Sequence, residues 1–209
     1  MASLPFVLET PSRPRRSRLP RSMSAMLLLA IVSGAGCGSG KGTKVTYHDA
    51  NMDFSQIQRV AVMPFANLTP MTQAADRVRD VFMTMLQATG SLYVLPPGEI
   101  QRGVGRARVA NPLQPTGDEA IALGKEIKAD VVITGTVREY GEVRSGNTTA
   151  NVVAVSAQMI ETQSGKVVWS ASSSKGGVSA GDRLLGGRGE PMNAVTEKAV
   201  RDLIDKLFK

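Results

Sequence analysis

The near-continuous apolar run at residues 59–65 most constrains what this chain can fold into. A short apolar run without polar alternation is typical of a strand that is buried on both faces, as in a sheet with helices on each side. Apolar residues then recur at helical spacing over residues 74–86. Thr69 and Pro70 precede them and are the predicted N-cap and first-turn proline. The sequence therefore predicts a buried strand followed by an amphipathic helix.

The next part of the chain contains a second predicted strand and a segment without clear hydrophobic periodicity. Gly90 ends the helical pattern, and residues 92–95 are predicted to form a short strand. Residues 98–117 are rich in Gly, Arg and Pro, and the only element suggested there is a short helix near Ile100. This segment is otherwise expected to be a loop.

A second helix and a third strand follow with stronger local signals. Thr116 and Glu119 have the spacing of a capping box, which opens a helix that continues through Ile127. Residues 130–137 are again nearly all apolar or β-branched and predict another buried strand. The order strand, helix, strand, helix, strand is that of an α/β layer.

The chain changes character after this layer. Two β-rich runs at residues 151–160 and 166–171 flank residues 162–165, where Gly165 provides the positive φ of a hairpin turn. The segments 138–150 and 172–190 are rich in Gly and Ser, lack apolar alternation and are expected to be loops.

The predicted chain ends in a helix that starts at Pro191. Its apolar face is formed by Val195, Ala199, Leu203 and Leu207. The predicted fold class is therefore α/β: a single domain with three layers, over residues 57–209, with a mixed sheet, a β-α-β-α-β start, a β-hairpin and a C-terminal helix.

The N-terminus has the order of an export signal. An Arg-rich stretch at residues 13–21 is followed by an apolar run at 26–32 and by small residues at 33–36. Seven apolar residues are far too few to span a bilayer as a helix. We expect residues 1–36 to be a signal peptide that is removed before Cys37, the only cysteine, and residues 37–56 to be a flexible tether.

Removing the signal peptide changes the charge of the chain. Residues 1–36 hold five of the 25 basic residues and one of the 18 acidic residues, so the net charge falls from +7 to +3. No basic stripe interleaved with aromatic residues remains. Nucleic-acid binding is therefore not expected.

Few residues offer catalytic chemistry. The single histidine, His48, has no second histidine or free thiol with which to share a metal, and it is expected to be a solvated tether residue. No nucleophile motif occurs, so we predict no enzymatic activity, no cofactor and no metal. Trp169, the only tryptophan, is expected to pack in the core.

Two segments are candidates for contact with a partner. Arg102, Arg106 and Arg108 could present a cationic patch to anionic lipid or an acidic protein, with a solvated loop as the alternative. Leu184 and Leu185 lie within a polar Gly- and Ser-rich loop, so they require cover from the core, from a partner or from lipid.

Several of these segments together resemble one group of bacterial envelope proteins. The segments are residues 60–67, Ala129 and Asp130 leading into residues 133–136, and the hairpin at residues 160–169. The group comprises the curli secretion lipoprotein CsgG, the N-terminal domain of the translocation protein TolB and the penicillin-binding-protein activator LpoB. The resemblance covers most of residues 57–209 and implies a periplasmic α/β domain that works by binding or assembly, with a homo-oligomer as one expected form.

The sequence around Cys37 resembles a bacterial lipoprotein processing site. Ala35, Gly36 and Cys37 fit that pattern, whereas Gly34 departs from it because Leu or a similar residue is usual there. The resemblance implies that Cys37 carries lipid, including palmitate. Gly38 is not the Asp that signals retention in the inner membrane, so an outer-membrane anchor on the periplasmic face is expected. A soluble periplasmic protein cleaved nearby is the alternative.

Members of this group differ in function, so two functions remain open. The first is a CsgG-like module for envelope assembly or export, and the second is an LpoB-like activator of a peptidoglycan synthase. The sequence does not identify the envelope partner.

Overall fold

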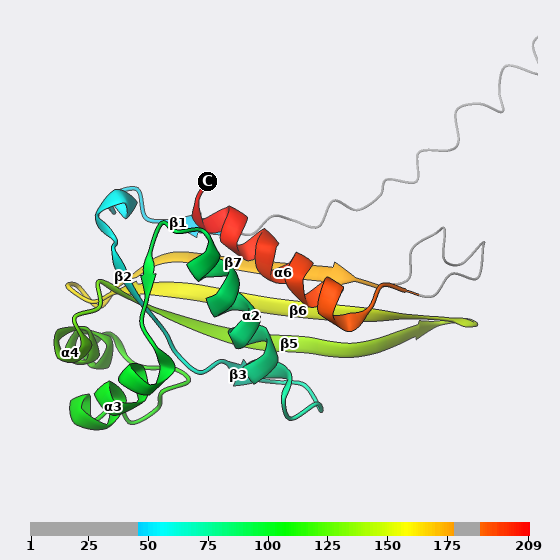
Figure 1. The fold of residues 1–209 in the computed structure, drawn as a ribbon, viewed down its shortest axis with the longest axis horizontal. Coiled ribbons are helices and arrows are strands. Elements are labelled where there is room, and N and C mark those ends of the chain that lie inside the picture. Colours follow the sequence, from blue (N-terminus) through cyan, green and yellow to red (C-terminus); the bar gives the residue numbers. More distant parts are fainter. Residues whose placement is uncertain (1–45, 178–188) are drawn as a thin grey trace, which may run out of the picture. The chain divides into compact units, whose positions relative to one another are not determined.

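The computed structural model describes residues 46–177 and 189–209, which form one mixed sheet between two layers of helices (Figure 1). The strands are β1 (Thr46–His48), β2 (Arg59–Val62), β3 (Ala66–Asn67), β4 (Tyr93–Val94), β5 (Val131–Ser145), β6 (Thr148–Glu161) and β7 (Val167–Gly176). Their order across the sheet is β1-β7-β6-β5-β2-β4, and β3 pairs with β5. β2 is parallel to β4 and β5, whereas β5, β6, β7 and β1 are antiparallel neighbours. The predicted mixed sheet is confirmed.

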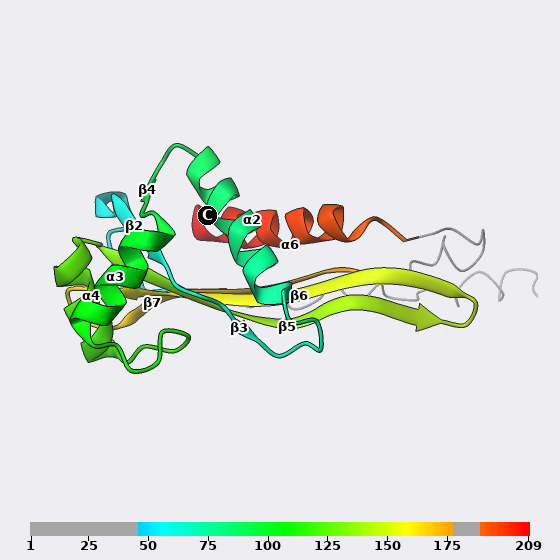
Figure 2. The same ribbon diagram turned by 60° about the horizontal axis from the view of Figure 1, so that its bottom comes forward.

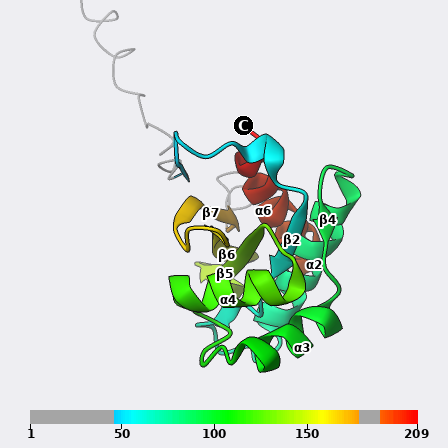
Figure 3. The same cartoon turned by 90° about the vertical axis from the view of Figure 1, so that its left-hand side faces the viewer.

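The helices are α2 (Ala74–Ala88), α3 (Pro97–Ala107), α4 (Gly117–Ile127) and α6 (Met192–Leu207), with a short 3-10 helix, η1 (Phe54–Gln56). Figure 3 shows α2 and α6 on one side of the sheet and α3 and α4 on the other. Two apolar clusters fill these layers, one beneath α2 and α6 and a smaller one beneath α3 and α4. No helix in the described part of the chain is long and apolar enough to cross a membrane.

The run at residues 59–65 lies between both helix layers, as predicted. Val60 and Val62 pack with α2 and α6, whereas Ala61 and Met63 pack with α3 and α4, because successive side chains of a strand point to opposite faces. All four are fully buried.

Several local predictions are also confirmed. The Thr116 hydroxyl accepts a bond from the Glu119 amide, and the Glu119 carboxylate accepts one from the Thr116 amide, which completes the capping box. Gly165 has φ 70° in the β6–β7 turn. Pro191 precedes α6, and Trp169 is fully buried, with its Nε1 donating to the carbonyl oxygen of Lys206 at 3.3 Å.

The predicted cap at Thr69 and Pro70 is wrong, because α2 begins only at Ala74. The Asn67 side chain accepts bonds from the amide and hydroxyl of Thr69 and donates to the Met71 carbonyl. These contacts organise residues 67–71 as a turn, so the Thr69 hydroxyl does not cap a helix.

The segments 138–150 and 172–176, expected to be loops, are strand instead, apart from the hairpin turn at residues 146 and 147. β5 and β6 pair without a break from Val131 and Glu161 to the turn at Gly146, apart from one bulge after Val137, and β7 continues to Gly176. Figure 2 shows this hairpin running on past α3 and α4. Tyr140 and Val153 of the extension still pack in the core, and beyond this pair the strands are held mainly by backbone pairing between polar residues, which leaves no clear apolar period in the sequence.

The folded part also starts earlier than residue 57. β1 pairs with β7 through the registers Thr46 to Ala171 and His48 to Trp169, and η1 follows it. Residues 46–56 are therefore not a flexible tether. The predicted signal peptide, Cys37, Leu184 and Leu185 all lie outside the described residues.

Candidate functional site

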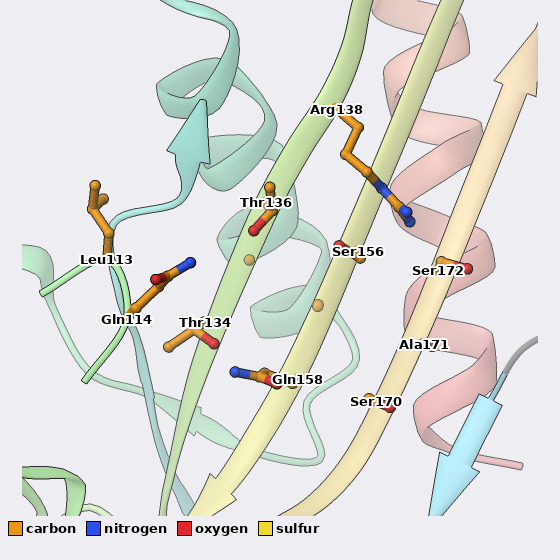
Figure 4. A pocket seen from close by; sticks show the side chains of 12 residues that line it. Leu113, Gln114, Thr134, Thr136, Arg138, Ser156, Gln158, Ser170, Ala171 and Ser172 are labelled. Carbon is orange, nitrogen blue, oxygen red and sulfur yellow. The ribbon is translucent and has the colours of Figure 1, made fainter. Parts of the chain in front are cut away.

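The face of the sheet beneath α3 and α4 is covered at one end only. The cluster under these helices includes Val132 of β5 but no residue of β6 or β7. Beyond it lies a shallow pocket of about 490 Å³, bordered by Leu113 and Gln114 of the loop between α3 and α4 (Figure 4). Seven polar side chains of the three central strands line it, and we call this set the open face: Thr134, Thr136, Arg138, Ser156, Gln158, Ser170 and Ser172.

Strand register places the open face in two rows. Thr136 pairs with Ser156, which pairs with Ser172. Gln158 lies between Thr134 and Ser170 in the next row. The rows belong to one face because the alternate residues, such as Val155, Ala157 and Met159 of β6, are buried against α2 and α6.

The side chains of the open face are mostly small and almost all uncharged. Five of its seven members are Ser or Thr residues, three on β5 and β6 and two on β7, so the sheet backbone lies close beneath the surface (Figure 4). The one charged member is Arg138, which is exposed and stands at the bulge in β5, where the register shifts between Val137 and Glu139. In Figure 4 its side chain extends from β5 towards β6.

The polar groups of the open face are not used by the described part of the fold. Within the described residues, none of its seven side chains forms a hydrogen bond or ion pair with another part of the protein. Thr134 is nevertheless only 3% exposed. Hydroxyl and amide groups can both donate and accept, so this surface can bond to many polar partners without prior rearrangement.

The remaining candidate chemistry lies elsewhere. His48 is exposed in β1 and contacts the Phe54 ring edge-on, with ring centroids 5.4 Å apart. No group of His, Cys, Asp and Glu side chains that could hold a metal ion occurs among residues 46–177 and 189–209.

The three arginines predicted as a loop patch are placed on a helix. Arg102 and Arg106 are exposed on α3, and Arg108 is its left-handed C-cap residue with φ 54°. Arg106 pairs with Glu126 of α4, which neutralises part of the predicted cationic patch. The suggested helix near Ile100 is confirmed, and the loop prediction for the arginines is wrong, because the apolar residue Ile100 and the small residue Gly103 give α3 a face that packs on α4.

The open face was not predicted from the sequence. A signal was present, since Ser156 and Gln158 alternate with buried apolar residues along β6. Alternation alone does not show which polar side remains uncovered, because that depends on where α3 and α4 end.

Comparison with known proteins identifies the fold. No protein-family model and no curated protein matches the sequence. A point variant of PelC from Paraburkholderia phytofirmans, solved as a dodecamer, has a TM-score of 0.53 and 19% identity over 79% of this chain and 98% of that chain. The lipoprotein GNA1162 from Neisseria meningitidis has a TM-score of 0.51 and 17% identity over 72% and 98%.

A third solved structure is more distant. The LpoB C-terminal domain from Salmonella enterica has a TM-score of 0.44 and 16% identity over 56% of this chain and 81% of that chain. That similarity is too low to carry a functional inference. At these identities the similarity to PelC and to the lipoprotein GNA1162 shows a shared fold, and the fold alone.

Proposed function

We propose that this protein is a non-enzymatic lipoprotein of the cell envelope, anchored through Cys37 on the periplasmic side of the outer membrane, and that it acts in envelope assembly or export by binding other subunits through the open face. The observation that carries the proposal is the open face itself: polar side chains on three adjacent strands with no partner in the described part of the protein.

The composition of the open face supports a protein contact. The cores of protein interfaces are depleted of charged residues, because each charge that is buried loses its hydration. Most solvent-facing surfaces carry Lys and Glu at high density. Here six of the seven side chains are uncharged, and their small size lets a second surface approach the sheet closely.

We assign a second copy of this chain as the occupant of the open face. The PelC structure with the same fold is described as a dodecamer, which supports an assembly of copies. Side chains that both donate and accept hydrogen bonds suit such an assembly, because either copy can supply either role.

The distance from the anchor favours the assembly function over the LpoB-like alternative. Only eight residues separate Cys37 from Thr46, the first residue of β1. When fully extended, the segment from Cys37 to Thr46 spans about 30 Å. A lipid at Cys37 would hold the domain near the membrane, whereas an activator that meets a synthase across the periplasm requires a longer reach.

The anchor is tested by Cys37→Ser in the producing cells. We expect loss of labelling by a palmitate analogue and release of the protein from the membrane fraction. Retention of the variant in that fraction, without lipid, would contradict the proposed anchor.

The open face is tested by Ser156→Arg, which places a charge at its centre. The matched control is Glu197→Arg on the exposed side of α6. We expect the parent and the control to be extracted in mild detergent as oligomers, and Ser156→Arg as a monomer, when mass is measured by light scattering. A monomeric parent, or an unchanged Ser156→Arg oligomer, would exclude assembly through this surface.

Deletion distinguishes the two cellular functions. Loss of a secreted or surface product is expected for an assembly or export module. Hypersensitivity to cell-wall antibiotics without that loss would instead support the activator of a peptidoglycan synthase.

A further inference from the structure

A second pocket lies at the point where the connections of two parallel strands leave the sheet in opposite directions. The chain after β2 leads into α2 on one face, whereas the chain after the adjacent parallel strand β4 leads into α3 on the other face. In open α/β sheets, ligands bind in the crevice outside the carboxyl ends of strands at such a switch point.

The pocket at this position has a volume of about 360 Å³, near the lower end of the range for small-molecule sites. Its walls are mostly apolar and are formed by three prolines, Pro64, Pro97 and Pro112, together with Ile100 and Val104 of α3. We call it the proline pocket. The polar residues that line it are Arg79 of α2 and Gln101 of α3.

Arg79 uses only one edge of its guanidinium within the protein. Its Nε donates to the Met63 carbonyl at 2.9 Å and to the Val62 carbonyl at 3.2 Å, and its Nη2 donates to the Val62 carbonyl at 2.6 Å. A guanidinium has five N–H donors in a fixed fork. The end formed by Nη1 and the second Nη2 hydrogen has no hydrogen-bond partner among the described residues.

The charge of Arg79 is also unpaired. It is half-buried, and no carboxylate of the described residues lies within ion-pairing distance of it. Asp76 and Asp80 are its acidic neighbours on α2 and are exposed to solvent. Burial lowers the pKa of the Arg79 guanidinium, and these two carboxylates oppose that shift. A cation that is partly desolvated without an ion pair gains much from an anion that reaches it.

We propose that the proline pocket binds a monocarboxylate with a small aliphatic body, whose carboxylate pairs with the free Nη1 and Nη2 edge of Arg79. The aliphatic body lies against Pro64, Ile100 and Val104. Arginine favours this geometry because two parallel N–H bonds match the two carboxylate oxygens. The apolar walls disfavour inorganic phosphate, which would lose hydration without gaining contacts. The pocket is separate from the open face and from the proposed assembly.

Binding is measured by calorimetric titration of the full-length protein with hexanoate. The uncharged analogue hexanamide and inorganic phosphate are the ligand controls. We expect saturable binding of hexanoate and at least about tenfold weaker binding of both controls. A second pair, acetyl-alanyl-alanyl-leucine and its C-terminal amide, distinguishes a free acid from a peptide terminus, since tighter binding of the free-acid peptide than of hexanoate identifies a peptide terminus as the source.

Two variants and one matched control locate the site. Arg79→Met should weaken hexanoate binding at least about tenfold. Arg77→Met removes the same charge from the same helix at an exposed position and should leave the affinity within about twofold. Gln101→Trp keeps Arg79 and its bonds to the strand carbonyls but fills the mouth of the pocket, so it should also weaken binding.

Thermal unfolding of each variant shows whether the fold is retained. If Arg79→Met does not fold stably, the hexanoate affinity of Gln101→Trp alone tests the proposed site. The proposal is overturned if hexanoate shows no saturable binding, if hexanamide binds equally well, or if folded Arg79→Met or Gln101→Trp retains the parent affinity.

Discussion

Replacing Gly124 of α4 by alanine tests how closely the α4 layer packs on the sheet. A Cβ atom at this position would lie 2.2 Å from Cβ and 2.5 Å from Cγ2 of Thr162 in the turn between β6 and β7. Thr162 cannot move away easily, because it is 7% exposed and its hydroxyl is 2.6 Å from the Ala129 carbonyl oxygen and 2.9 Å from that of Asp130.

The expected loss of stability follows from three terms. Overpacking of this kind costs about 1–3 kcal/mol. Disturbing the Thr162 hydrogen bonds adds about 1 kcal/mol, and the higher helix propensity of alanine returns up to about 1 kcal/mol. Gly124→Ala should therefore lower the free energy of unfolding by about 1–4 kcal/mol. For a domain of this size that is a fall in Tm of roughly 2–16 °C.

Differential scanning calorimetry of the purified protein measures this change. The matched control is Gly105→Ala in α3, where an added Cβ meets no atom within 4 Å. Because only helix propensity changes there, this variant should be unaffected or up to about 1 kcal/mol more stable. If Gly124→Ala unfolds at or above the temperature of the parent, the close packing of α4 on Thr162 is refuted.

Three further outcomes are expected. Trp169→Ala should lose about 3–5 kcal/mol in denaturant titrations, since this side chain is fully buried beneath α6, and a loss under 1 kcal/mol would contradict that burial. Thr116→Ala should lose about 1 kcal/mol through loss of the N-cap, with an unchanged Tm as the contrary result. Hydrogen bonds from the Thr116 and Ala110 amides hold the pKa of Glu119 below its ordinary value of 4.5. The ionised Glu119 carboxylate therefore stabilises the fold fully above pH 4.5, and this stabilisation is lost as the pH falls through the lower pKa of the folded state. Glu119→Gln should thus flatten the dependence of Tm on pH below 4.5, and an identical slope in both proteins would count against this role.

The sequence alone determined the elements whose signals are local. The buried strand β2, the capping box of α4, the Gly165 turn and the apolar face of α6 each depend on residues within a few positions of one another. These patterns act through the periodicity of a helix or strand and through nearby backbone hydrogen bonds. The export signal and Cys37 are read from the same kind of local pattern and stay predictions.

Tertiary pairing decided the elements that have no local signal. β1 and the distal part of the β5–β6 hairpin are polar, and they are strands because a partner strand satisfies their backbone groups. At Thr69, Asn67 competes for the hydroxyl that was expected to cap α2. No sequence period distinguishes these outcomes from a loop.

Both proposed sites also arise only in three dimensions. The open face stays uncovered because α3 and α4, with 11 residues each, reach only the first part of β5. The proline pocket gathers residues from four segments, at Pro64, Arg79, 97–104 and Pro112, around the carboxyl end of β2. The sequence determines which side chains are available. The lengths of α3 and α4, and the opposite faces over which the chain passes after β2 and β4, decide which side chains lie together and which remain exposed.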